Sequence, residues 1–163
     1  MTLIEFTGVP GSGKTHLCRI LSDRLRSRKI PVLTPFEGVA ETNAVRRMGA
    51  KFVTLSLFAL THIPLAVRSY YTIARTRQSS VLDAVRSYAT LLNVVRIVEK
   101  GRRVGDIVLL DQGVVQSAFT ILYAAGKVPN ADAFNGLPVP DMLIEVDADG
   151  GAIAGRRRSS RGR

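Results

Sequence analysis

The sequence contains one cysteine, two histidines and no apolar run long enough to be read as a membrane span. Because Cys18 stands alone, no disulfide can form within the chain and no multi-cysteine metal site can be built. We expect Cys18 to serve packing, and we assign neither His16 nor His62 to a metal ion. This thiol usage fits a reducing compartment, so we expect a cytoplasmic protein.

The N-terminal segment also lacks the basic start and long apolar stretch of a signal peptide. The longest apolar stretch covers 52–67 and contains His62 and Pro64, whereas a helix that crosses a membrane needs about 20 mostly apolar residues. We therefore expect a pair of buried helical segments broken near Pro64. Peripheral contact with a membrane surface is the less favoured alternative.

Positive charge is unevenly distributed along the chain. The formal net charge is +10, and a large share of it lies in a C-terminal run of five arginines: Arg156, Arg157, Arg158, Arg161 and Arg163. Such a run could contact nucleic-acid phosphates. No aromatic interleaving or recognisable nucleic-acid module accompanies it, which argues against nucleic-acid binding as the main function.

A length of 163 residues with 46% hydrophobic residues is typical of a single domain, which we assign to 1–163. Leu3, Ile4 and Phe6 predict a buried strand, and helical spacing begins at Lys14. The alternation continues with the following expected elements: a strand at 30–33, mainly helix at 42–77, a helix from Val81 that Gly101 can end, a strand at 107–110, helix at 112–125, a loop at 129–140 and a strand at 142–146. This order predicts an α/β fold whose parallel sheet is covered by helices on both faces.

Residues 8–15, Gly-Val-Pro-Gly-Ser-Gly-Lys-Thr, match the phosphate-binding pattern G-x-x-x-x-G-K-[ST] at every position. Glycines let the backbone wrap around phosphate oxygens, and the following helix directs its positive end toward them. Lys14 can neutralise the β and γ phosphates, while the Thr15 hydroxyl can bind Mg²⁺. The pattern predicts that ATP and Mg²⁺ are bound by Gly8, Pro10, Gly11, Ser12, Gly13, Lys14 and Thr15.

A Mg²⁺-bound triphosphate usually needs an acidic anchor at the end of a neighbouring strand, and Asp111 is the best candidate for a catalytic and metal-binding role. The alternative is that Asp111 only caps a helix. Gln112 follows it instead of a second acid, which favours transfer over vigorous hydrolysis. Glu37, in the loop after the second strand, could bind the acceptor substrate or act as a base, and it could equally be a solvated loop acid.

The arginine run also has two interpretations. As a lid at 150–163, its guanidinium groups, with Arg156 and Arg161 as catalytic candidates, could close over the transferring phosphoryl group and stabilise its charge. As a solvated tail it would need no partner.

With these residues in place, the chain resembles the thymidylate kinase branch of the P-loop nucleoside and nucleotide kinases. The resemblance depends on Gly8 to Thr15, on VLLDQG at 108–113, and on PDMLIEVDAD at 140–149 followed by RRRSSRGR. It implies a three-layer P-loop NTPase fold with strand order 2-3-1-4, an arginine lid at the C-terminal run, and an acceptor bound between the second and third strands.

Three departures from that family concern the acceptor and the adenine site. Gln112 stands where the family usually has an arginine that binds the acceptor's phosphate, and the loop at 35–38 lacks the family's arginine. The sequence also stops in the expected lid, before the helix and fifth strand that help hold the adenine ring in these kinases, so we expect a fragment or a shortened relative.

The resulting expectation is a magnesium-dependent kinase that moves the γ-phosphoryl group of ATP to a small-molecule acceptor, such as a nucleoside or nucleotide. A nucleotide-binding protein without turnover, in a regulatory or scaffold role, is the alternative. A GTP switch is disfavoured because the sequence lacks the N-K-x-D motif that reads guanine. A homodimer is also left open.

Overall fold

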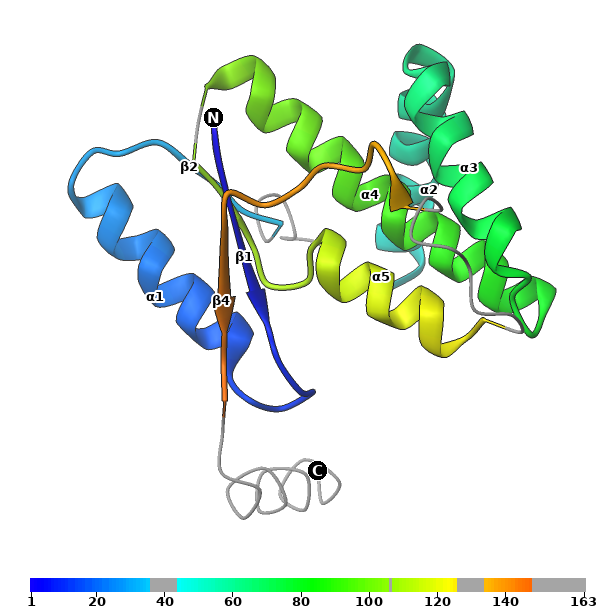
Figure 1. Ribbon diagram of the computed structural model, residues 1–163. Helices are drawn as coiled ribbons and strands as arrows, with labels where there is room; N and C mark the ends of the chain where they lie inside the picture. The colour runs from blue at the N-terminus through cyan, green and yellow to red at the C-terminus, as the bar shows by residue number, and fades with distance from the viewer. Residues whose placement is uncertain (36–43, 106, 126–133, 148–163) are drawn as a thin grey trace.

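A computed structural model describes residues 1–35, 44–105, 107–125 and 134–147. Within them the chain is an α/β protein with a four-stranded parallel sheet in the order β2-β3-β1-β4 (Figure 1). The predicted parallel sheet and its strand order are therefore confirmed. The elements in chain order are β1 Thr2–Thr7, α1 Lys14–Ser27, β2 Val32–Leu33, α2 Ala44–Thr61, α3 Ile63–Thr76, α4 Val81–Val104, β3 Ile107–Leu110, α5 Val114–Tyr123 and β4 Met142–Glu145.

The register of the sheet brings the ends of β1 and β3 together. Glu5 of β1 lies opposite Leu110, the last residue of β3. Because the strands are parallel, their carboxyl ends reach the same edge of the sheet. The loop that starts at Gly8 and the turn that starts at Asp111 therefore leave the sheet as neighbours.

Alternation along β1 divides its side chains between two cores, as expected for a strand covered on both faces. Leu3 packs into the larger cluster with residues of α2 to α5, whereas Phe6 packs with Cys18 of α1 in the smaller one. Figure 1 shows α1 alone on one side of the sheet and the other helices on the opposite side. The described part of the chain thus forms three layers, with α2 and α3 packed against the outside of α4.

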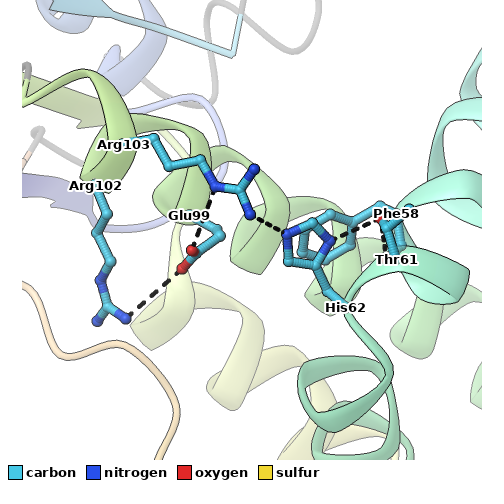
Figure 2. Close-up of polar contacts among 6 residues, drawn as sticks. All are labelled: Phe58, Thr61, His62, Glu99, Arg102 and Arg103. Carbon is cyan, nitrogen blue, oxygen red and sulfur yellow. Dashed lines mark hydrogen bonds and ion pairs between the residues drawn. The ribbon is translucent and has the colours of Figure 1, made fainter.

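The helical region after β2 breaks at His62, close to the predicted break near Pro64. The His62 ring stacks on Phe58 with ring centroids 4.4 Å apart, and Arg103 Nη2 donates to His62 Nε2 over 2.5 Å (Figure 2). An accepting Nε2 leaves Nδ1 to donate to the Thr61 hydroxyl, 2.8 Å away. Since Arg103 also pairs with Glu99, the end of α4 fixes the bend between α2 and α3.

The prediction that both segments around this bend are buried is wrong in part. Phe58 and Ala66 are buried, but most of the larger apolar side chains point outward because each helix packs along only one side. The exposed residues of this stretch are Val53, Leu57, Leu60, Ile63 and Val67. None of the helices that the structure describes is long and apolar enough to cross a membrane.

The predicted end of the long helix at Gly101 is also wrong. Helix α4 continues to Val104, and Gly105 ends it with φ of 77°, the left-handed conformation that glycine adopts readily. Gly101 has a different role, since a Cβ there would overlap the side chain of Val108 in β3. The missing side chain lets α4 lie close against the sheet.

Candidate nucleotide-binding site

The loop between β1 and α1 takes a conformation that depends on glycine. Gly8, Gly11 and Gly13 have φ angles of 140°, 91° and 102°, a region that residues with a Cβ rarely adopt. A side chain at Gly8 would also overlap the carbonyl oxygen of Val146, just beyond β4. The loop can therefore turn back sharply above the sheet edge, as a chain that wraps around phosphates must.

Lys14, the first residue of α1, folds its side chain back over this loop. It is only 9% exposed, and its Nζ donates to the carbonyl oxygens of Gly8 at 2.7 Å and Val9 at 2.9 Å. Burial lowers the pKa of Lys14, and the nearby negative charge of Asp111 opposes that shift. The structure thus places a cation at the centre of the loop.

Two further features of the loop leave hydrogen-bond donors without a protein partner. The Ser12 hydroxyl is buried and has no hydrogen-bond partner within the described residues. Helix α1 starts with Gly13 as its N-cap, so no side chain caps its first turn, and that turn carries no acidic residue. Orphan donors at a helix N-terminus favour an anion.

Thr15 and Asp111 meet beside the loop. The Thr15 hydroxyl donates to Asp111 Oδ2 over 2.7 Å, which joins the first turn of α1 to the end of β3. No group of three or more His, Cys, Asp or Glu side chains that could hold a metal occurs in the described ranges. A hydroxyl and one carboxylate nevertheless fit Mg²⁺ bound to a nucleotide, because that ion takes most of its ligands from phosphates and water.

Asp111 does not cap the helix that follows it. The N-cap of α5 is Gly113, and the first-turn N–H groups of Val115 and Gln116 donate to the two carboxylate oxygens of Glu5, at 3.0 and 2.8 Å. The alternative that Asp111 only caps a helix is therefore wrong, because Glu5 of β1 accepts the first-turn hydrogen bonds of α5. Asp111 keeps its carboxylate turned toward Thr15.

Glu5 is the residue near the candidate site that the sequence interpretation missed. It is fully buried, and its two accepted hydrogen bonds attach the start of α5 to the centre of the sheet. Gly113 has no side chain to obstruct this contact, since a Cβ there would overlap the Glu5 carboxylate. The sequence does hold a signal for this role, because Glu5 follows Leu3 by two residues and side chains at that spacing in a strand point to the same face. The sequence interpretation had considered only the apolar residues of this strand.

The structure describes some of the remaining candidate residues and leaves others outside its described ranges. Gln112 is exposed directly after Asp111, and His16 is exposed on α1. Cys18 is fully buried; desolvation chiefly, with a contribution from Asp111, raises its pKa to about 12, in keeping with the predicted packing role. Glu37 and the arginine run with Arg156 and Arg161 lie outside the described residues.

The structure therefore brings together the loop at 8–15 and Asp111. Of the acceptor and lid candidates it describes Gln112, which is exposed next to Asp111. Comparison of the chain with protein-family models gives no match, and comparison with curated proteins gives none either.

Proposed function

We propose that the chain is an ATP-dependent phosphotransferase of the P-loop kinase type, similar to thymidylate kinases. The observation that carries the proposal is the position of Lys14, whose ammonium is held over a glycine loop by the carbonyls of Gly8 and Val9. A buried cation beside orphan donors costs free energy unless an anion or a set of carbonyls compensates it. A bound triphosphate would replace those carbonyls.

The loop would bind the triphosphate through its backbone. The first-turn N–H groups of α1 and the unpartnered Ser12 hydroxyl would donate to phosphate oxygens, and Lys14 would reach the β and γ groups. The two oxygens of Thr15 and Asp111 that lie 2.7 Å apart would hold Mg²⁺, which neutralises phosphate charge when bound. Glu5 would keep the Asp111 turn in place by fixing the start of α5.

The transfer itself requires little covalent chemistry from the protein. An oxygen of the acceptor attacks the γ phosphorus, the bond to the β–γ bridging oxygen breaks, and ADP leaves with that electron pair. The proton of an attacking hydroxyl passes to a base, for which Glu37 is our candidate, or to water. Lys14 and the arginine run would stabilise the charge that spreads over the transferred group.

Gln112 bears on the choice of acceptor. It is exposed beside Asp111 and offers only neutral hydrogen bonds where the resembling kinases use an arginine. A phosphorylated acceptor would bring about two negative charges to a position without that cation, which is costly. We therefore propose an acceptor with a neutral hydroxyl group, in preference to thymidine monophosphate.

The decisive experiment combines titration calorimetry with ATP and Mg²⁺ and an assay of ADP formation against nucleosides, nucleotides and sugars. Binding with acceptor-dependent ADP formation supports the kinase. Binding with no turnover for any acceptor supports the alternative, a nucleotide-binding protein without catalysis, and no binding refutes both. A kcat/KM above about 10⁴ M⁻¹s⁻¹ for thymidine monophosphate, an ordinary enzyme value, would contradict the assignment of a neutral acceptor.

A further inference from the structure

The outward side of α3 carries an apolar stripe that no described part of the protein covers. Ile63, Val67, Tyr70 and Tyr71 are 60%, 44%, 60% and 59% exposed. Their spacing of four, three and one residues places them on one side of the helix. The opposite side packs into the protein through Ala66, Ser69, Thr72, Ile73 and Thr76, all of them buried.

A second set of exposed apolar side chains lies on α2, the helix before the bend. Val53, Leu57 and Leu60 recur at the same helical spacing and are 57%, 58% and 72% exposed. Leu60 and Ile63 stand on either side of His62, whose ring is held by Phe58 and Arg103 (Figure 2). Figure 1 shows α3 at the rim of the molecule, on the far side of α4 from the sheet. The bend is therefore fixed, and the stripe lies away from the nucleotide site.

The charged residues of α2 and α3 are all basic, and Glu99 of α4, near the bend, is paired with Arg102 and Arg103. Residues 44–82 include no aspartate or glutamate. Arg68 and Arg75, two turns apart, flank the stripe and line a hollow of about 490 Å³ together with Tyr71 and Thr72. Arg68 Nη1 donates to the carbonyl oxygen of Gly136 over 3.2 Å, which holds this arginine at the hollow. The hollow could receive an anionic head group next to apolar side chains.

We propose that this stripe, with Arg68 and Arg75 at its flank, docks on the surface of an anionic phospholipid bilayer. Aliphatic side chains would enter the boundary of the acyl region, while tyrosine combines an apolar ring with a hydroxyl suited to the head-group level. Arginines beside the apolar face then meet lipid phosphates. The occupant is not a second copy of the chain, because a symmetric pairing would bring the arginines together with no acid on either helix.

The proposal goes beyond phosphoryl transfer and is tested without nucleotide. The whole chain is sedimented with vesicles of phosphatidylcholine alone or of phosphatidylcholine mixed with phosphatidylglycerol. We expect binding to the mixed vesicles only. Ile63→Ser with Val67→Ser should weaken it about tenfold or more, since each lost apolar group forfeits transfer free energy. Arg75→Gln should weaken vesicle binding about fivefold, which is the contribution expected of one cation at an anionic membrane surface.

Matched controls distinguish docking by the stripe from nonspecific adsorption to vesicles. Val139→Ser removes an even more exposed apolar group, and Arg24→Gln removes a cation from α1, across the sheet. Both should bind vesicles as the unchanged chain does. Lys14→Ala should also bind normally, so failure of nucleotide binding and failure of docking remain distinguishable.

Four outcomes would overturn docking by the stripe. The first two are equal binding to both vesicle types and no binding to either. The third is normal binding by the Ile63→Ser, Val67→Ser variant. The fourth is a dimer, seen by light scattering, that this variant abolishes while the chain does not bind vesicles. A variant with Arg156, Arg157, Arg158 and Arg161 changed to Gln measures the electrostatic share of the C-terminal run. If that variant loses all vesicle binding while the Ile63→Ser, Val67→Ser variant binds fully, the C-terminal run is responsible for binding and docking by the stripe is refuted.

Discussion

Thr15 and Asp111 are 96 positions apart in the sequence, and the hydroxyl of one donates to the carboxylate of the other over 2.7 Å. The bond links the helix that follows the glycine loop to the strand beside β1. Hydroxyl and carboxylate oxygens held at this distance can both turn toward one cation with little rearrangement. The first prediction concerns that pair.

Asp111→Asn should make ATP binding almost independent of Mg²⁺. The change removes the carboxylate charge at the Thr15 contact, and a lost charge-assisted contact is worth about 1.5 to 3 kcal/mol, or about ten- to a hundredfold in affinity. Calorimetry with ATP in Mg²⁺ and in a chelator measures the difference. Asp23→Asn on the exposed side of α1 is the control, and Thr15→Ser should keep the Mg²⁺ effect. An unchanged effect in Asp111→Asn would remove Asp111 from the site.

Lys14→Ala should weaken ATP binding by about ten- to a hundredfold, because the cation at the centre of the loop is lost. The fold should persist, since the hydrogen bonds of Lys14 Nζ to described residues go to two loop carbonyls. Calorimetry and circular dichroism check the two parts. Lys100→Ala, an exposed lysine on α4, should bind ATP normally. A folded Lys14→Ala protein with unchanged affinity would refute nucleotide binding at this loop.

Gly113→Ala should destabilise the protein by about 1 to 3 kcal/mol, because the new methyl group would overlap the buried Glu5 carboxylate. Glu5→Gln should cost a similar amount. Val115 and Gln116 donate to different carboxylate oxygens, and the amide nitrogen that replaces one of them cannot accept. Urea unfolding measures both. Gly49→Ala, where the new Cβ meets nothing within 4 Å, should be neutral or stabilising by up to about 1 kcal/mol. Equal effects at the two glycines would contradict the contact with Glu5.

Cys18 should resist thiol reagents in the folded protein. Burial raises its pKa to about 12 from an ordinary 9.0, which leaves about a thousandfold less thiolate at neutral pH. The unfolded chain loses this proton first as the pH rises, so stability should fall above about pH 9. Ellman's reagent with and without denaturant checks the reactivity, and rapid labelling of the folded chain would show that Cys18 is accessible.

Removal of the lid candidates should affect turnover more than binding. Changing Arg156, Arg157, Arg158 and Arg161 to Ala should lower kcat while ATP affinity changes little, because a lid acts mainly on the transition state. Replacing Arg24 on α1 and Arg28 at its C-terminal cap removes two cations outside the run and is the control for loss of positive charge. Equal kcat in the variant and the unchanged chain would identify the run as a solvated tail.

Sequence patterns predicted the sheet because its signals are local and strong. The mainly apolar runs at 3–6 and 107–110 are hard to interpret as anything but buried strands. The strand order was inferred from the family resemblance. Boundaries that depend on neighbours were less predictable. The strand expected at 30–33 begins at Val32, because the N–H of Ile30 is used to close α1, by donating to the carbonyl of Leu25 over 3.0 Å.

The candidate site was predictable in its contiguous loop and in Asp111, which was identified by its place directly after an apolar strand. The loop at 8–15 is a single run of letters, so the glycine pattern identifies it directly. Glu5 caps a helix that starts more than a hundred residues later, a relationship that no local spacing reveals. Gly101 was misread for a related reason, since a glycine that ends a helix and one that admits Val108 look alike until the packing partner is known.

The central position of β1 also constrains the order in which the protein folds. Its two neighbours, β3 and β4, begin at Ile107 and Met142, and the N–H of Leu3 donates to the carboxylate of Asp141, 138 positions away. Contacts of such long separation form late, because the intervening chain must first be closed into a loop. During synthesis the glycine loop leaves the ribosome well before the strands that flank β1. The first residues translated are thus among the last to reach their native partners.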